Sequence, residues 1–479
     1  MNYKMLRYMP FWVVKLEGVL LILPVFAALI YGEAKTAWIY FATAVFLTAA
    51  GILFTIKKPE DAEIYRRDGC VIVALGWIIF CLLGAVPFVL TGDIPSYINA
   101  FFETVSGCTT TGASILPDVE ALSHAGLFWR SLTHWIGGMG VLVFLLILVP
   151  VKNGSQMNLM KAESPGPDVS KFVPRFRDTA ALLYKIYIIM TAAQAINLLI
   201  TGMAPFDALC ITFGTAGTGG FAVLNSGVAA YTPLQQWIIA VFMMLFGVNF
   251  MFYYLLLIRK GRVAVKMEEV KAYFIIIAAA TAGIAFCIRG SFDTAEETLR
   301  HSFFQVTSIM TTTGFASTDF NLWPSFAKMI LMLLMFIGAC AGSTGGGIKV
   351  SRIMLTVKAV NREAYSMIHP RSIRRIRMNG HAIDNEMVRS VLTYLSTYVI
   401  IFALSLLIIS LNGFSFETTF SAVSAAINNI GPGFDAVGPM SNFNAFSPLS
   451  KIVLIFDMIA GRLELYPVLI LLSPGTWKR

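Results

Sequence analysis

The sequence is short of charge. Asp, Glu, Lys and Arg make up only 13% of its 479 residues, whereas hydrophobic residues make up 57%, and this balance excludes an ordinary soluble domain. Its six cysteines are scattered without paired spacing, so the sequence predicts neither a disulfide framework nor a metal site. It also lacks a cluster of catalytic carboxylates, histidines or a nucleophile at one membrane depth, which argues against a membrane-embedded enzyme.

Apolar runs close to the ~20 residues needed to cross a bilayer recur along the whole chain. We expect ten spans, at residues 11–32, 36–56, 70–92, 126–150, 178–201, 233–258, 271–290, 326–349, 388–411 and 449–473. The sequence therefore predicts an integral membrane protein. An even number of crossings places both termini on one side of the bilayer.

Basic residues are almost absent from alternate connections between these spans. None occurs from 201 to 231 or from 411 to 450, whereas the other connections contain many, above all the segment from Lys349 to Arg389. Because cytoplasmic loops carry the excess of Lys and Arg, both termini are predicted to be cytoplasmic. The net charge of +9 is therefore a topology signal, and no nucleic-acid partner is predicted.

A Thr- and Gly-rich stretch occurs four times along the chain. The copies are SGCTTTGAS at 106, FGTAGTGGFAV at 213, TSIMTTTGFAS at 307 and SAAINNIGPGF at 424. Before each copy comes a half-apolar segment too short to span, at 96–108, 205–214, 295–310 and 415–427. A full-length apolar run follows each copy, so the repeating unit is long helix, short helix, Thr/Gly strand, long helix.

Two crossings separate each copy from the next, so all four copies lie on the face that is poor in Lys and Arg. The predicted fold is an all-α polytopic membrane protein with four parallel helix–pore helix–filter–helix repeats around a pseudo-fourfold pore. This plan differs from an inverted-repeat transporter, in which alternate copies are upside down. The expected units are two N-terminal helices at 1–66 and pore repeats at 67–152, 153–262, 263–360 and 361–479.

Four such segments around one axis form a ring of oxygens. Non-helical backbone at membrane depth has to be buried in protein or line a water-filled cavity. Glycine lets the chain turn its carbonyls inward, and carbonyl rings replace the hydration shell of a cation in potassium-channel filters. A single Thr/Gly loop would be interpreted as a surface turn, but four copies at equivalent positions favour the pore.

The sequence resembles the Trk/Ktr/HKT superfamily of potassium transporters over nearly its whole length, and specifically the Trk-type membrane subunit. The motifs that carry the resemblance are the four filters, FWRSLTHWIGGMGV at 128–141, AGSTGGGIK at 341–349, NNIGPG at 428–433 and AGRLELYP at 460–467. The two helices before the first repeat are similar to the Trk type rather than the shorter Ktr type.

The resemblance implies a potassium-binding filter in each repeat. The implied residues are Thr110, Thr111, Gly112, Thr218, Gly219, Gly220, Thr312, Thr313, Gly314, Asn429, Ile430 and Gly431. The fourth repeat departs from the pattern, and one inserted residue is needed to align Gly431 with the other glycines. In the plant branch a serine in the first filter accompanies sodium transport, so Gly112 implies potassium.

The stretch AGSTGGGIK nearly matches a phosphate-binding P-loop, but Ile348 stands where the lysine is required and Lys349 comes one place late. In the family this segment interrupts the second long helix of the third repeat and obstructs the pore below the filter. The implied gate residues are Gly342, Ser343, Thr344, Gly345, Gly346, Gly347, Lys349 and Arg462. A helix C-terminal cap is the alternative interpretation of the glycines.

Arg462 is predicted to lie well inside the last span, where it has to face protein or water. The resemblance implies that it projects toward the pore under the filter; a structural pair with Asp457 or Glu464 is the alternative. His134 is interpreted as an interfacial or packing residue. Glu103 and Glu417, in the short helices, either add negative potential or cap local hydrogen bonds.

The predicted function is potassium uptake through a selective, gated pore, driven by the electrochemical gradient. A potassium symporter coupled to protons or sodium is the alternative. The resemblance implies a bacterial cytoplasmic (inner) membrane location, a homodimer and a cytosolic nucleotide-binding regulatory subunit (TrkA-like). Potassium is the transported ion, no nucleotide site is visible in this chain, and no enzymatic activity is predicted.

Overall fold

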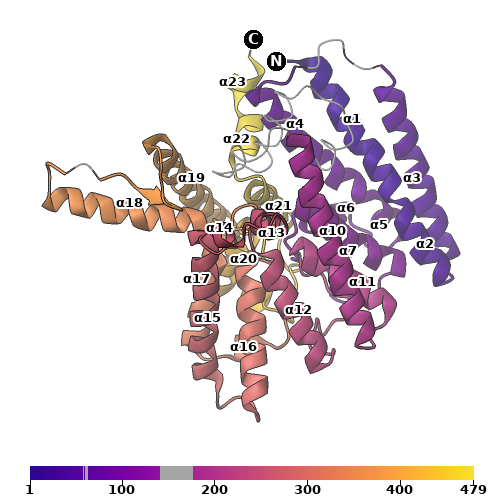
Figure 1. Ribbon diagram of the computed structural model, residues 1–479. Coiled ribbons are helices and arrows are strands. Elements are labelled where there is room, and N and C mark those ends of the chain that lie inside the picture. Colours follow the sequence, from indigo (N-terminus) through magenta and orange to yellow (C-terminus); the bar gives the residue numbers. More distant parts are fainter. Residues whose placement is uncertain (58, 60–62, 141–175, 373, 479) are drawn as a thin grey trace.

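The computed structural model describes residues 1–479 except 58, 60–62, 141–175, 373 and 479 (Figure 1). Its described part is mostly helical, and its strands are confined to one small antiparallel hairpin in which Arg377 pairs with Ala382 and Met378 with His381. Both termini lie at the same end of the helical bundle (Figure 1), as an even number of crossings requires.

The N-terminal helices are apolar and pack against one another through small residues. Their bounds are α1 Tyr3–Leu20, α2 Ile22–Ile30, α3 Ala34–Thr55, α4 Arg66–Gly84 and α5 Val86–Thr91. A Cβ atom on Gly18 of α1 would lie 2.6 Å from the backbone nitrogen of Thr48 in α3, so only glycine permits this approach. Small residues at such contacts let apolar helices pack closely in a membrane.

The middle of the chain alternates long and short helices. The bounds are α6 Tyr97–Cys108, α7 His124–Met139, α10 Phe176–Ile200, α11 Pro205–Gly217, α12 Pro233–Phe246, α13 Phe250–Leu257, α14 Gly261–Ala264, α15 Glu268–Ile288, α16 Ala295–Met310, η1 Phe320–Leu322 and α17 Ser325–Ile337. The predicted short segments correspond to α6, α11, α16 and α20 (Phe416–Ile427), with starts and ends within three residues of the prediction.

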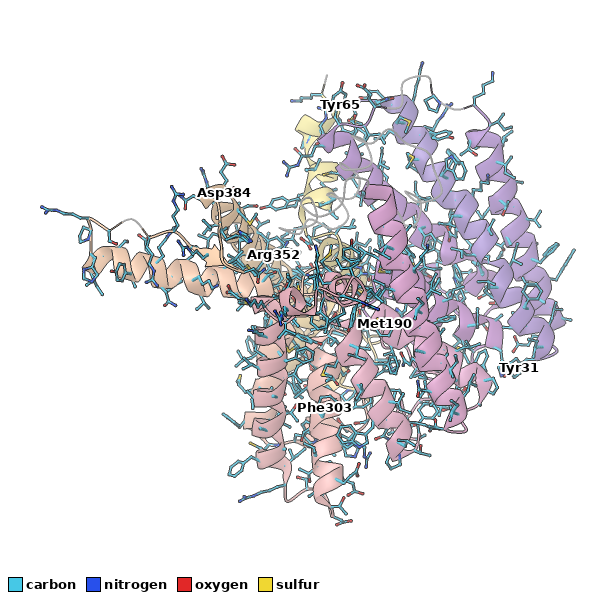
Figure 2. The ribbon with its side chains drawn as sticks, viewed as in Figure 1. Tyr31, Tyr65, Met190, Phe303, Arg352 and Asp384 are labelled. Atoms are coloured by element: carbon cyan, nitrogen blue, oxygen red, sulfur yellow. The ribbon has the colours of Figure 1, made fainter. Side chains whose placement is uncertain are left out.

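The remaining elements follow a long non-helical loop. Their bounds are α18 Val350–Ile368, β1 Arg377–Met378, β2 His381–Ala382, α19 Asn385–Ile409, η2 Ser410–Asn412, α20 Phe416–Ile427, η3 Asp435–Val437, α21 Pro448–Arg462, α22 Tyr466–Leu472 and α23 Pro474–Trp477. Figure 1 shows α18 projecting sideways from the bundle. Figure 2 places Arg352 at the base of α18 and Asp384 at the start of α19.

Most of the ten predicted spans correspond to apolar helices, and three of the predicted spans are broken. Among the described residues, six helices are long and apolar enough to cross a membrane, or seven if the bent pair α12 and α13 counts as one. That pair bends by 88°, the run 326–349 is helical only to Ile337, and the run 449–473 breaks between Arg462 and Tyr466. Residues 141–150 of one predicted span, and the predicted domain boundary at 152, lie outside the described residues.

Candidate ion pathway

The four short helices end in the same hydrogen-bonded motif. After α6, the N–H of Thr110 donates to the carbonyl of Gly107 at 3.1 Å and the N–H of Thr111 donates to that of Ser106 at 2.8 Å. The equivalent bonds are Thr218 to Thr215 (3.1 Å), Gly219 to Gly214 (2.8 Å), Thr312 to Ile309 (3.1 Å), Thr313 to Ser308 (2.8 Å), Asn429 to Ala426 (3.2 Å) and Ile430 to Ala425 (2.9 Å). This pair of hydrogen bonds is the Schellman motif, which requires a left-handed residue just beyond the end of the helix.

That left-handed position is occupied by a residue with a side chain in every copy. The φ angles are +56° at Thr110, +56° at Thr218, +59° at Thr312 and +55° at Asn429. Two residues later comes a glycine with positive φ, at 81° in Gly112, 78° in Gly220, 86° in Gly314 and 99° in Gly431. Asn429 and Gly431 thus have the backbone conformation of Thr110 and Gly112, which is the register expected from one inserted residue.

The four glycines close a ring. A Cβ atom on Gly112 would lie 2.0 Å from the carbonyl oxygen of Gly219 in the second segment. The corresponding approaches are Gly220 to Thr313 at 2.0 Å, Gly314 to Ile430 at 2.0 Å and Gly431 to Thr111 at 2.6 Å. Each glycine therefore faces the carbonyl that precedes the glycine of the next segment, and the fourth segment returns to the first.

A cavity of about 170 Å³ opens onto this ring and is lined largely by the loops that follow the four ring glycines. It is lined by all four glycines, and Arg130 also reaches its wall. At ~30 Å³ per water molecule it has room for a few waters above the ring. The negative C-terminal ends of the four short helices point to the same centre, which favours a cation there.

His134 in α7 connects the first two segments. Its ring is fully buried; Nδ1 lies 2.8 Å from the carbonyl oxygen of Gly107, and Nε2 accepts a hydrogen bond from the Phe221 N–H at 3.1 Å. These partners require the neutral tautomer with the proton on Nδ1. The packing interpretation of His134 is therefore the one that the structure favours, with a positioning contact to the second segment.

Asn429 connects the fourth segment to the first. Its Nδ2 donates to Thr111 Oγ1 at 3.0 Å and to the Met458 carbonyl at 2.8 Å. An amide at this position thus supplies a bridge for which a threonine side chain is too short. This gives a physical reason for the departure of the fourth motif from the Thr pattern.

Glu103 forms a buried ion pair. Its carboxylate is 2.7 Å from Arg130 Nη2 and accepts from the Ile115 N–H at 2.9 Å, while the guanidinium lies over the Phe221 ring at 4.0 Å. Because Arg130 offsets its charge, Glu103 braces the loop behind the first segment rather than adding a free negative potential. Glu417 lies 3.2 Å from Lys328 Nζ at an exposed site.

Asp435 secures the loop after the fourth segment. Hydrogen bonds from Ser415 and from Thr418, the latter at 2.7 Å, hold the pKa of its carboxyl below the ordinary value. The group is consequently an anion at neutral pH. It fixes the loop to the start of α20, the short helix of the fourth repeat.

The glycine-rich loop between α17 and α18 lies directly against the ring on its other side. The Gly346 N–H donates to Thr312 Oγ1 at 2.6 Å, and a Cβ on Gly346 would lie 2.7 Å from the Asn428 carbonyl. The cap role belongs to Gly338, which ends α17 with φ +72° and precedes AGSTGGGIK. The capping alternative therefore does not account for Gly345 or Gly346.

Arg462 is the last residue of α21, not an interior one, because the chain breaks at Glu464 and Leu465, whose φ angles are positive. Its guanidinium donates to the Thr344 carbonyl at 2.9 Å and to the Gly138 carbonyl at 2.9 Å, and also to that of Gly137. It thus joins the loop to the end of α7.

The two acidic residues proposed as its structural partners have other contacts. Glu464 pairs with Arg352, and Asp457 accepts from Ser405 at 2.7 Å. Lys349 donates to the Gly345 carbonyl within the loop. The structure therefore brings Arg462 and Lys349 to the loop with the predicted glycines.

Glu269 is a contact of the loop that the sequence did not reveal. Its carboxylate is buried at the start of α15, and Oε1 accepts from the Ala341 N–H at 2.7 Å and from the Ser351 N–H at 3.1 Å. These residues flank the loop, so one side chain holds both of its ends. The sequence offered one signal for each contact that the prediction missed. Glu269 is a carboxylate at the edge of a predicted span, and Arg130 is a charged residue within another span.

A bundle of apolar helices around four re-entrant segments that close a ring defines the class: a multi-pass membrane protein built for moving small ions. The chain matches the TrkH family model, described as a cation transport protein, over residues 35–286 and 289–477. It therefore belongs to the TrkH family.

Relatives share nearly the full length of the chain. It is 36% identical over 470 residues to the Trk system potassium uptake protein TrkH of Salmonella typhimurium, covering 96% of each chain. It is 32% identical over 491 residues to the Trk system potassium uptake protein TrkG of Escherichia coli, covering 100% of this chain and 99% of the relative. The crystal structure of the potassium transporter TrkH from Vibrio parahaemolyticus matches with a TM-score of 0.88, 31% identity and 100% coverage of both chains.

Proposed function

We propose that this protein takes up potassium across the cytoplasmic membrane through a gated pore at the ring of four glycines. The observation that carries the proposal is the closed ring, in which each glycine meets a carbonyl of the next segment. Inward-facing peptide oxygens replace the water lost by a dehydrated potassium ion. The names of the relatives supply the ion, because they are potassium uptake proteins.

The filter comprises the twelve residues named from the resemblance, three in each segment, with Gly112 in the first. The gate is the loop from Gly342 to Lys349 together with Arg462, and it closes the ring from the cytoplasmic side. The contact between Gly346 and Thr312 supports this role because it leaves little room beneath the third segment.

Potassium moves inward down its electrochemical gradient. A monovalent cation gains about 2.3 kcal/mol per 100 mV of inside-negative potential, so uptake needs no chemical step in this chain. Consistent with this, the TrkH family is a family of transporters rather than enzymes.

The proposed organisation is two N-terminal helices and four parallel repeats with both termini in the cytoplasm of a bacterial cell. A cytosolic, nucleotide-binding, TrkA-like subunit regulates the gate, and two copies of the chain form a homodimer. The naming of the relatives as parts of a Trk system supports a multi-component assembly.

Uptake of rubidium by the purified protein in liposomes tests the function. With potassium inside and an imposed inside-negative potential, we expect rubidium to accumulate and excess external potassium to compete better than sodium. Absence of uptake in folded protein contradicts the proposed pore. Uptake that requires a proton or sodium gradient instead establishes the symporter alternative.

A further inference from the structure

A basic cleft lies outside the ion pathway, between α18 and the chain that follows it. It has a volume of about 640 Å³ and is lined by Lys358, Asn361, Arg362, Arg374, Arg375, Ile376 and Arg377. Five of these seven residues are cationic, and no role in the pathway accounts for them.

Most of this positive charge has no acidic partner. Among the described residues, no carboxylate forms an ion pair with Arg374, Arg375 or Arg377. Arg362 donates to the amide oxygen of Asn385 at 2.9 Å, and Arg374 lies over the Tyr365 ring at 5.1 Å. Cations held together in a cleft without counter-charges create a strong local potential for an anion.

The cleft is fixed at the cytoplasmic end of a membrane-spanning helix. Glu268, the first residue of α15, pairs with Lys358 and accepts from the Asn379 N–H at 2.7 Å, and its own N–H donates to Asn379 Oδ1 at 2.8 Å. Arg362 in turn contacts Asn385, the first residue of α19. In the predicted topology both helices enter the bilayer at these residues, which would place the cleft at the level of the lipid headgroups.

The helix that forms one wall of the cleft also has an exposed apolar face. The exposed side chains are Val357 (54%), Val360 (61%), Met367 (76%) and Ile368 (72%). A helix with one basic and one apolar face is typical of a segment that lies in the membrane interface. This face favours a lipid over a soluble acidic protein as the neighbour of the cleft.

We propose that the cleft binds the phosphate headgroup of an anionic phospholipid in the cytoplasmic leaflet. Arginine suits this ligand because its planar guanidinium donates two parallel hydrogen bonds to phosphate oxygens. Basic pockets beside membrane helices on the cytoplasmic side bind such headgroups. The site is separate from the proposed ion pathway and does not depend on it.

Lipid titration of the purified full-length protein, followed by native mass spectrometry, tests the proposal. The affinities for phosphatidylglycerol and phosphatidylcholine are compared between the unmodified protein and the cleft variant Arg374→Gln/Arg375→Gln, in which both replaced residues are exposed. Arg262→Gln/Lys266→Gln is the matched control, because it removes the same charge from exposed cytoplasmic residues outside the cleft. We expect the cleft variant to lose phosphatidylglycerol affinity on the order of tenfold, while the control binds like the unmodified protein.

Other outcomes overturn the assignment. Equal loss in both variants would mean non-specific attraction to charge, and unchanged lipid binding with loss of an acidic protein partner would assign the cleft to that partner. Glycerol phosphate or inorganic phosphate at millimolar concentration provides the competing arm. If either displaces the lipid, the cleft is a site for a soluble phosphate. Rubidium uptake by the cleft variant shows separately whether the pore is intact.

Discussion

At the scale of single residues, the ring depends on backbone conformations that side chains disfavour. Thr110, Thr218, Thr312 and Asn429 all have positive φ, which costs a non-glycine residue about 1–2 kcal/mol. Each is held by the two carbonyl contacts at the end of its helix. Backbone strain of this kind persists only where many surrounding contacts hold the residue in its conformation. Such sites are commonly functional.

Gly112→Ser tests the ring at its first segment. We expect reduced discrimination between potassium and sodium, because a Cβ at this position would lie 2.0 Å from the Gly219 carbonyl and displace it. The measurement is the ratio of potassium to sodium permeability in liposomes. Gly92→Ser is the control, since Gly92 has φ +87° but no atom within 4 Å of its added Cβ. An unchanged ratio in folded Gly112→Ser protein contradicts the filter assignment.

Glu269→Ala tests the residue that holds both ends of the loop. Each hydrogen bond to a carboxylate contributes about 1.5–3 kcal/mol, so removing both is expected to raise basal rubidium flux by about tenfold or more. Glu269→Gln retains an acceptor oxygen and should give an intermediate flux.

Glu363→Gln, at an exposed position of α18, is the control for charge alone. Glu269 has no positioning role if its alanine variant is folded and conducts like the control.

At the scale of elements, the loop between α17 and α18 is held by three parts of the protein that are distant in sequence. Glu269 fixes its two ends, Thr312 of the third segment contacts its centre, and Arg462 of α21 binds the Thr344 carbonyl. Displacing this loop, the proposed gate, would therefore require several contacts to break together, which is typical of an element with two discrete positions.

Substitutions of Arg462 distinguish two roles of this residue: its hydrogen bonds to the loop and to α7, which brace the loop, and its positive charge. Lysine keeps the charge but cannot reach carbonyls of the loop and of α7 at once, because it lacks the guanidinium fork. We expect several-fold faster rubidium flux in Arg462→Lys and a further increase in Arg462→Gln, which also removes electrostatic repulsion.

Arg289→Lys, at an exposed site after α15, is the control for the change of side chain. If Arg462→Lys behaves like the unmodified protein and only Arg462→Gln is faster, Arg462 acts through its charge and the bracing interpretation is wrong.

At the scale of the whole molecule, parallel repeats require successive connections to lie on opposite sides of the membrane. Ala230 and Lys266 are both exposed, and they lie in successive connections before α12 and α15. In intact cells, a membrane-impermeant thiol reagent is expected to label Ala230→Cys and not Lys266→Cys.

The unmodified protein supplies the background for this labelling, since five of its six cysteines are buried. Labelling of Lys266→Cys without cell lysis would reverse the predicted topology.

Much of the fold follows from local patterns. The lengths of the apolar runs predict the long helices, and the half-apolar segments predict α6, α11, α16 and α20 nearly to their ends. The left-handed glycines are also predictable, because Gly112, Gly220 and Gly314 align without gaps. These features depend on residues that are close in sequence.

The sequence by itself determined a membrane protein with four equivalent short helices and four glycine-bearing segments. Only the tertiary structure decided the 88° bend between α12 and α13, the break after Arg462 and the closure of the ring. It also decided that His134 meets Phe221 and that Glu269 meets Ala341. Hydrophobicity records that a segment is buried, but not which distant backbone group a buried polar side chain will satisfy.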